Sequence, residues 1–355
     1  ENERYTYKRF FAEVDALASQ FQGDYEIAKG DRVAIAMRNN VEWMISCCAA
    51  ILVGAVVVPI NSWGKTAELE YAITDSGASL LVCDEARLKL IENRLDDIDL
   101  PVIVVPATET FTRPDQVALF DDVISAGAEQ SYTAVDVASD DNAFILYTSG
   151  STGFPKGVLH RHRSIGQAMM NMMFLGLLVA EFEGGPRQYR GGAERETPLL
   201  TVPLFHATGL ISGLLMPIML AQKVVMMYKW DSGRALELIE QERVTGLSSV
   251  PAILQDLLNH PQYDSHDTRS LMRISAAGAA TPAGLPELIA AKVENPSRSA
   301  GYAMTETMAV CSTMSGALFD FKPDSAGVVS PIMELRLVRA DGSEAADGEP
   351  GEIQL

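Results

Sequence analysis

The chain has 355 residues, of which 47% are hydrophobic and 21% charged, and its formal net charge at pH 7 is −19. This length can bury one large or two medium hydrophobic cores, and the composition is that of an ordinary globular protein. Non-specific binding to nucleic acids or to anionic membranes needs basic patches, so the acidic charge argues against both.

Helical and strand patterns alternate through the first 105 residues. Apolar residues at helical spacing predict helices over 6–22, 41–52 and 68–76, the second being closed by Gly54. Short apolar runs predict strands over 32–36, 55–59, 79–83 and 101–105. Such alternation predicts an α/β fold with a largely parallel sheet.

Two polar segments interrupt this alternation, which continues after the second of them. A linker is expected over 131–142, and a surface loop, or alternatively a cap over a substrate entrance, over 181–197. The apolar stretch 207–221 is short for a membrane span and contains glycine and proline, so we expect a buried helix and no transmembrane segment. Further elements are predicted over 223–227, 233–243 and 272–276, followed by short strands and turns from residue 320.

The four cysteines show no spacing typical of a metal or redox site. Neighbouring Cys47 and Cys48 point away from each other on a helix, and Cys83 and Cys311 stand alone. Free, mostly buried thiols are typical of a reducing compartment, so the protein is expected to be cytoplasmic. His160 and His162 are separated by a single residue, but the sequence suggests no third metal ligand near them.

Residues 144–158 read FILYTSGSTGFPKGV and are the most informative segment of the chain. An apolar strand ends in a loop of hydroxyls and glycines with Lys156, a composition that suits a polyphosphate. Composition alone is equally compatible with a Ser/Gly surface turn. A Walker A loop is excluded, because Pro155 and Gly157 flank the lysine.

The string YTSGSTGFPKGV (147–158) resembles the phosphate-binding signature of the adenylate-forming superfamily, which includes acyl- and aryl-CoA synthetases, peptide-synthetase adenylation domains and luciferases. PLFHATGL (203–210) resembles the histidine motif of its acyl- and aryl-CoA ligases. GYAMTET (301–307) resembles the motif that carries a metal-binding glutamate. Weaker similarities are found in GDRVAI (30–35), GAVVVPIN (54–61), SSVPAIL (248–254), GAATP (278–282) and DGEPGEI (347–353).

The resemblance covers nearly the whole chain and implies a fold. It is the large N-terminal domain of the superfamily, with two β-sheets flanked by helices in a layered αβαβα arrangement. Residues 1–319 would form the nucleotide- and acyl-binding core, with the phosphate loop at 147–158, and 320–355 an incomplete β-barrel subdomain. The family pattern continues with a ribose-binding aspartate and a C-terminal lid carrying a catalytic lysine, neither of which we expect within this chain.

The resemblance also implies a reaction in two steps. A carboxylate attacks the α-phosphorus of ATP to give an acyl-adenylate and pyrophosphate, and the thiol of CoA then takes the acyl group. Mg²⁺ would accompany ATP, and the acid would be fatty or otherwise apolar. Two alternatives stay open: transfer of the acyl group to a carrier protein, and a nucleotide-binding fragment with little turnover.

By resemblance, the phosphates are bound by the hydroxyls, glycines and lysine of the loop. These residues are Thr148, Ser149, Gly150, Ser151, Thr152, Gly153 and Lys156. Glu306 would hold Mg²⁺, a hard cation that prefers carboxylate and phosphate oxygens, and Thr305 would contact the α-phosphate. Taken alone, a Thr-Glu pair is more typical of a helix cap.

The adenine and the acyl chain would contact two further segments. These are Gly278, Ala279 and Ala280, and Gly301, Tyr302, Ala303 and Met304. Tyr302 offers a face for adenine. Ala303 stands where the family most often has glycine, so its methyl group is expected either to narrow the acyl channel or to shift the backbone slightly. Taken without the resemblance, residues 278–280 are equally a plain tight turn.

His206 resembles the family's histidine between the adenylate and the acyl tunnel, although a lone histidine is more often structural. The aspartate motif of amino-acid-activating domains is not evident, which favours an acid without an α-amine. Apolar residues around 169–174, 208–214 and 250–254 are candidates to line the tunnel.

Overall fold

The computed structural model describes residues 3–98, 100–107, 117–148, 155–186, 188–276, 278–279, 282–309 and 311–355. The chain divides into two compact units. The first comprises Glu1–Ile165 and Pro198–Asp231, and the second Gly166–Thr197 and Ser232–Leu355.

A mostly parallel sheet forms the centre of the first unit, with strand order β5-β4-β3-β1-β2-β6-β7. Its strands are β1 Arg32–Ala36, β2 Val56–Pro59, β3 Leu80–Asp84, β4 Val102–Val105, β5 Val117–Leu119, β6 Asn142–Tyr147 and β7 Gly157–Arg161. All neighbouring strands pair in parallel except β6 and β7, which form an antiparallel hairpin. The inner strands are continuous apolar runs because both faces of a parallel sheet are buried.

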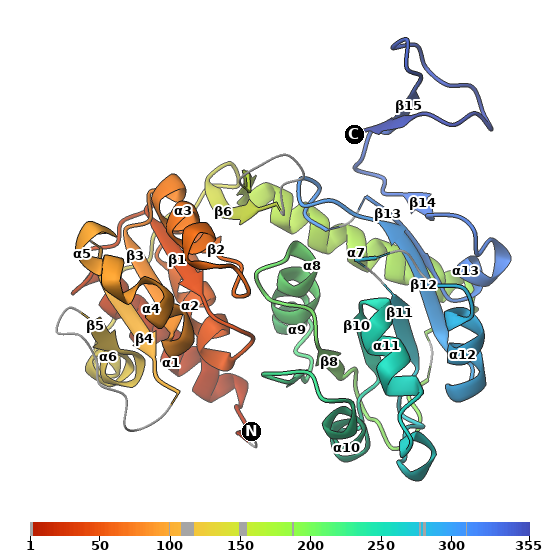
Figure 1. Ribbon diagram of the computed structural model, residues 1–355, viewed down its shortest axis with the longest axis horizontal. Helices are drawn as coiled ribbons and strands as arrows, with labels where there is room; N and C mark the ends of the chain where they lie inside the picture. Colours follow the sequence, from red (N-terminus) through yellow and green to blue (C-terminus); the bar gives the residue numbers. More distant parts are fainter. Residues whose placement is uncertain are drawn as a thin grey trace. The chain divides into compact units, whose positions relative to one another are not determined.

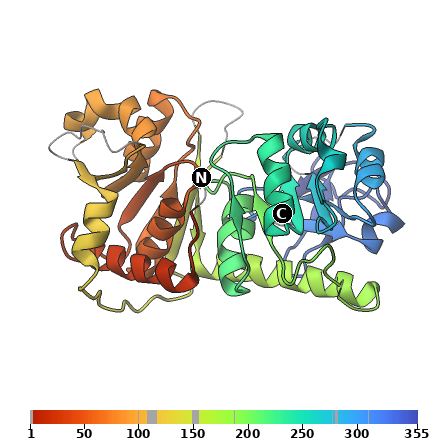
Figure 2. The same ribbon diagram turned by 90° about the horizontal axis from the view of Figure 1, so that it is seen from below.

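Helices cover both faces of this sheet (Figure 1). One group is α1 Tyr7–Gln22, α2 Val41–Leu52 and α6 Phe120–Gly127, and the other is α3 Thr66–Ser76, α4 Glu85–Ile91 and α5 Leu95–Ile98. Figure 2 shows the red helices α1 and α2 and the orange helices α3–α5 on opposite sides of the strands. Side-chain oxygens of Thr6, Asn40 and Asp84 accept from the first turns of α1, α2 and α4, which fixes where these helices begin.

The first unit also contains the segment 198–231. It holds the parallel pair β8 Pro198–Leu200 and β9 Val225–Met226, and a helical stretch of α8 Ala207–Leu210, a π-helical turn Ile211–Leu215 and α9 Met216–Met219. The predicted buried helix is therefore present, but its middle is wider than an α-helix. Pro217 has no N–H to donate to the preceding turn, which is consistent with this local change of hydrogen bonding.

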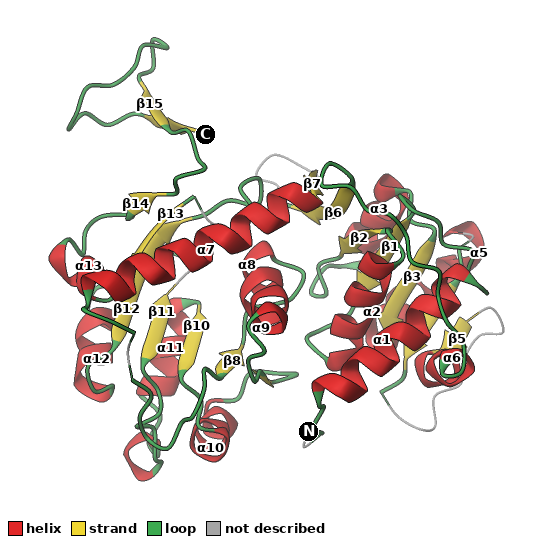
Figure 3. Cartoon of the chain, turned by 180° about the vertical axis from the view of Figure 1, so that it is seen from behind, coloured by secondary structure: helices red, strands yellow, loops and turns green. Residues whose placement is uncertain are grey.

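The second unit has its own sheet, in which β14-β13-β12-β11-β10 are neighbours. β10 Gly246–Ser249, β11 Arg273–Ala276 and β12 Ser297–Tyr302 are parallel, and β13 Ser312–Ser315 and β14 Val328–Val329 add antiparallel strands. Helices α10 Ser232–Glu242, α11 Pro251–Leu258 and α12 Leu285–Lys292 lie on one face. The long helix α7 His162–Phe182 crosses the other, and α13 Ala317–Phe321 packs beside β12 (Figure 3).

The predicted fold class is confirmed: each unit has a sheet rich in parallel strands, flanked by helices. The strand β7 was not predicted from the sequence. Near the C-terminus, β15 Arg336–Val338 pairs with β16 Glu352–Gln354. The assignment of 320–355 to a separate β-barrel subdomain stays a prediction.

In the described part of the chain, α7 is the one helix long and apolar enough to cross a membrane by length and composition. A single helix of this kind is weak evidence for a span, because core helices and signal sequences share these properties. The four cysteines are free thiols, and Cys47, Cys83 and Cys311 are buried.

A buried ion pair fixes the end of β3. The guanidinium of Arg87 donates to both carboxylate oxygens of Asp84, at 3.0 and 2.9 Å, and to the carbonyl of Ser62 at 2.8 Å. Asp84 also accepts from the backbone N–H of Arg38 at 3.2 Å, and both charged side chains are less than one-tenth exposed. Every partner in this network is therefore satisfied, as a buried charge requires.

Replacing Arg87 with Ala should lower the free energy of unfolding by about 3–5 kcal/mol, because the Asp84 carboxylate would stay buried without its counter-charge. The matched control is Arg94→Ala. Arg94 pairs with Asp97 at 3.0 Å but is half exposed, so its loss should cost less than about 1 kcal/mol. Urea unfolding of the two variants measures the difference, and equal losses would contradict the role given to the buried pair.

Candidate functional site

The phosphate-loop segment is the connection of the β6–β7 hairpin. The N–H of Thr148 donates to the carbonyl of Lys156 at 3.0 Å, and the N–H of Lys156 lies 3.3 Å from the Thr148 hydroxyl. A Cβ on Gly157 would come within 2.8 Å of the Ile145 side chain, so glycine is needed at this crossing. The predicted phosphate ligands Ser149, Gly150, Ser151, Thr152 and Gly153 lie outside the described residues.

The base of the loop is anchored and its lysine is exposed. The Tyr147 hydroxyl donates to Asp75 of α3 at 2.7 Å, which holds the end of β6 against a helix. The side chain of Lys156 is exposed and forms no ion pair with any residue that the structure describes. An exposed ammonium group at the start of β7 is therefore available to an anionic ligand.

Strand direction places the residues after β1, β2 and β6 at one edge of the first sheet. The carboxyl ends of parallel strands meet at the same edge, which is where α/β proteins bind ligands. Asn39 follows β1, Trp63 follows β2 and Thr148 follows β6. The two described ends of the predicted loop, Thr148 and Lys156, are thus at the edge where α/β proteins bind ligands.

His206 is brought to this same edge by backbone contacts. Asn39 hydrogen-bonds to the backbone of Val202 and Leu204, and the N–H of His206 donates to the carbonyl of Pro203 at 3.1 Å. The imidazole keeps an exposed face, and the apolar atoms around it desolvate the charged form and lower its pKa below the usual value. His206 is therefore neutral at pH 7 and can donate one hydrogen bond and accept another.

A second group of predicted residues meets at one edge of the second unit. Gly278 and Ala279 follow β11, and Tyr302 ends β12, the parallel neighbour of β11. Gly278 has φ +79°, a conformation that favours glycine, and an added Cβ would lie 3.5 Å from Val250 at the end of β10. The structure thus gathers the ends of the 248–254, 278–282 and 301–307 motifs, while Ala280 lies outside the described residues.

Glu306 lies in the turn between β12 and β13. The N–H groups of Met308 and Ala309 donate to the carbonyls of Thr305 and Met304, at 3.1 and 3.2 Å, which shapes the turn. The Thr-Glu pair caps no helix here. The carboxylate of Glu306 is exposed and has no hydrogen bond or ion pair with the described residues.

The donor set around Glu306 fits Mg²⁺ only in company with a ligand. No group of three or more His, Cys, Asp or Glu side chains that could hold a metal ion occurs in the described ranges. A single exposed carboxylate supplies one hard oxygen, and Mg²⁺ is commonly bound by one or two carboxylates together with substrate phosphates. The residues present therefore suit an ion that arrives with a nucleotide.

Two residues of the first unit were not singled out from the sequence. Asn39 contacts the backbone before His206, and the ring of Trp63 packs edge-on against Phe205 with centroids 5.7 Å apart. Both follow a predicted parallel strand, which is the positional signal that could have found them.

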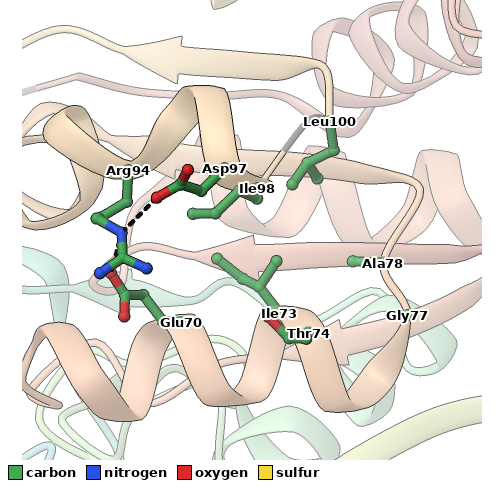
Figure 4. A pocket seen from close by; sticks show the side chains of 9 residues that line it. All are labelled: Glu70, Ile73, Thr74, Gly77, Ala78, Arg94, Asp97, Ile98 and Leu100. Atoms are coloured by element: carbon green, nitrogen blue, oxygen red, sulfur yellow. Dashed lines mark hydrogen bonds and ion pairs between the residues drawn. The ribbon is translucent and has the colours of Figure 1, made fainter.

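A cavity of about 310 Å³ lies elsewhere in the first unit (Figure 4). Among its lining residues, Gly77 and Ala78 precede β3 and Leu100 precedes β4, so it opens at the amino ends of these strands. Its charged groups already pair with one another, since Arg94 contacts both Asp97 and Glu70. It is therefore at the opposite edge of the sheet from the phosphate-loop segment and is not part of the candidate site.

Comparison with known proteins gives a consistent result. The family model described as AMP-binding enzyme matches residues 1–355. The chain is 30% identical over 348 residues to the long-chain-fatty-acid–CoA ligase FadD13 of Mycobacterium tuberculosis, covering 97% of this chain and 64% of that protein. It is also 30% identical to a feruloyl-CoA synthase of Amycolatopsis sp., covering 98% and 64%.

Among solved structures, the inhibitor-bound N-terminal domain of FACL13 from Mycobacterium tuberculosis superposes with a TM-score of 0.80 at 28% identity. That superposition covers 99% of this chain and 82% of the other. Nearly the whole of this chain is matched by the two curated relatives, but it spans a little under two thirds of their length.

Gly209→Ala should disturb the turn that carries His206, because the added Cβ would lie 2.0 Å from the carbonyl oxygen of Pro203. We expect a loss of about 1–3 kcal/mol in the free energy of unfolding, from backbone displacement. Gly166→Ala in α7 is the matched control, since nothing lies within 4 Å of its added Cβ, and it should stabilise by about 0.5–1 kcal/mol. Chemical denaturation checks both, and a neutral Gly209→Ala would show that the close contact is not required.

Proposed function

Because this chain belongs to the AMP-binding enzyme family, we propose that it activates a carboxylic acid with ATP. The product is an acyl-adenylate with release of pyrophosphate, and the acyl group then forms a thioester with CoA. The observation that supports the proposal is the hairpin of β6 and β7, whose described ends, Thr148 and Lys156, lie at the carboxyl edge of a parallel sheet.

The chemistry of the first step explains why such a loop is needed. A carboxylate must approach the phosphorus of an already anionic nucleotide, so the protein must neutralise charge and hold both reactants in line. A chain of net charge −19 repels both anions unless it supplies local positive potential. We assign that task to the loop amides, the Thr148 hydroxyl and Lys156, which would hold the departing pyrophosphate.

Glu306 is proposed to hold Mg²⁺ on the nucleotide, with Thr305 directed to the α-phosphate. When bound, the ion would neutralise phosphate charge during the displacement. The protein's own part is to keep a single carboxylate exposed in the β12–β13 turn, where it pairs with no Lys or Arg among the described residues. Tyr302, Ala303, Met304 and Gly301 of the same segment, with Gly278–Ala280, are proposed to contact the adenine and the acyl group.

His206 is proposed to orient the substrate carboxylate through a hydrogen bond and not through charge. Its lowered pKa leaves the imidazole neutral at pH 7, so it adds no cation to the site. A neutral donor positions an incoming carboxylate without binding it so tightly that attack on phosphorus is slowed.

The acid is proposed to be fatty or otherwise apolar. The two relatives described above are named for a long-chain fatty acid and for feruloate, both carboxylic acids with large apolar parts. ATP–pyrophosphate exchange by the full-length protein, screened over straight-chain, branched and aromatic acids, tests the activity and its substrate class. Thioester formation with CoA, compared with a carrier protein, identifies the acceptor.

Glu306→Gln should reduce acid-dependent ATP–pyrophosphate exchange by about 100-fold, because the amide binds Mg²⁺ poorly while keeping the shape of the side chain. Thioester formation from preformed acyl-adenylate should change much less. Glu334→Gln, at another exposed glutamate of the second unit, is the control. Equal losses in both half-reactions would count against the magnesium role.

Lys156→Ala should raise the KM for ATP by about 10-fold or more, because a charge-assisted contact to phosphate would be lost. Lys322→Ala removes an exposed lysine from the second unit and should leave ATP dependence unchanged. Initial rates at varied ATP give the comparison. An unaltered KM and kcat in Lys156→Ala would refute the assignment of the loop.

A further inference from the structure

The side chain of Asn39 bridges two backbone groups that lie far from it in the sequence. Its Nδ2 donates to the carbonyl of Val202 at 2.9 Å, and its Oδ1 accepts from the N–H of Leu204 at 2.8 Å. These groups flank Pro203, which has no N–H of its own to fix the segment. One planar amide therefore holds the peptide on both sides of the proline, as a neighbouring strand would.

The position of Pro203 sets the position of His206. The Pro203 carbonyl accepts from the His206 N–H at 3.1 Å, and Gly209 packs directly against the same oxygen. Helix α8 begins at the next residue, so His206 stands at the junction between the clamped segment and the helix. A shift of Pro203 would move the imidazole with it.

Contacts between aromatic rings also stabilise the segment that carries His206. The Trp63 ring lies edge-on to Phe205, and the Phe205 and His206 rings are 4.4 Å apart between centroids. Asn39, Trp63 and His206 belong to the same compact unit, so this arrangement is internal to it. Asn39 lies three residues after the end of β1, and the N–H of its neighbour Arg38 donates to Asp84 at the end of β3, which ties Asn39 to the sheet.

We propose that Asn39 is a positioning residue that acts through His206, holding the imidazole in place for adenylation without itself touching the reacting atoms. The inference rests on the proposed function for its effect on rate. The part of the inference that concerns the position of the His206 ring rests only on the two hydrogen bonds of Asn39.

The neighbouring Asn40 provides a matched control. Its side-chain oxygen caps α2 by accepting from the Trp43 N–H at 2.8 Å, and a carboxylate oxygen can do the same. Asn40→Asp therefore keeps its one essential bond. Asn39→Asp keeps the bond to Leu204 but turns an acceptor towards the Val202 carbonyl, where a donor is required.

In the full-length protein, Asn39→Asp should lower kcat for adenylation by about 10- to 100-fold, with the KM for ATP changed by less than about 3-fold, because a small misplacement of an orienting group mainly affects the chemical step. Asn40→Asp should stay within about 2-fold of wild type. In a His206→Ala background, Asn39→Asp should have little further effect, since the group it positions is gone. If Asn39→Asp unfolds at the assay temperature, Asn39→Ser replaces it.

A second readout does not depend on turnover. NMR titration of the histidine side chains should show the His206 pKa rising towards its ordinary value in Asn39→Ser, because a released ring becomes better solvated, and no change in Asn40→Ser. Serine is used for this measurement because an aspartate at position 39 would itself raise the pKa of a nearby imidazole through its charge. The inference is overturned by equal kinetics in the two Asp variants, by a full loss that persists without His206, or by an unchanged His206 titration. A wild-type protein that adenylates no acid would instead overturn the proposed function, and the titration would still decide the role of Asn39.

Discussion

The first unit depends on one satisfied set of buried charges at the carboxyl edge of its sheet. Burying Asp84 and Arg87 costs several kcal/mol in desolvation, and this cost is offset only because every donor and acceptor of the pair finds a partner. Two of those partners are backbone groups, the Arg38 N–H and the Ser62 carbonyl. Each is adjacent to a residue that contacts the His206 segment, Asn39 in one case and Trp63 in the other. The ion pair thus fixes the two supports of the candidate site.

The electrostatics of the chain and the chemistry proposed for it fit together. An acidic protein that binds a polyphosphate must confine its positive potential to a small region, because a broad basic surface would attract unrelated anions. Neutral His206 adds no charge, Lys156 is exposed without an ion pair to the described residues, and Glu306 can recruit a cation only when phosphate oxygens complete its ligands. The proposed function therefore has positive charge assembled mainly by the bound nucleotide and its cation.

The sequence predicted what depends on neighbouring residues and missed what depends on distant ones. Strands β1, β3 and β4 are continuous apolar runs, and the fold class followed from their alternation with helices. Strand β7 was missed because GVLHR has only partial alternation and its pairing with β6 is seen only once the loop closes. The motifs carried Lys156, His206 and Glu306 by resemblance. Asn39 belongs to no such motif. Its hydrogen-bond partners, Val202 and Leu204, lie more than 160 residues away, so only the folded chain reveals the contact.

The two residues beside Tyr302, Gly301 and Ala303, differ in whether the backbone there leaves room for a side chain. A Cβ on Gly301 would lie 2.7 Å from the Ser312 carbonyl in the antiparallel partner strand, so a side chain there would break the pairing of β12 with β13. Ala303 lies one residue beyond β12, is exposed, and has no positive φ, so its methyl group fits the fold without strain. A substitution that leaves the backbone undisturbed acts on whatever binds beside it. Under the proposed function, the size of the acid is the property that Ala303 would change, while Gly301 preserves the strand that precedes it.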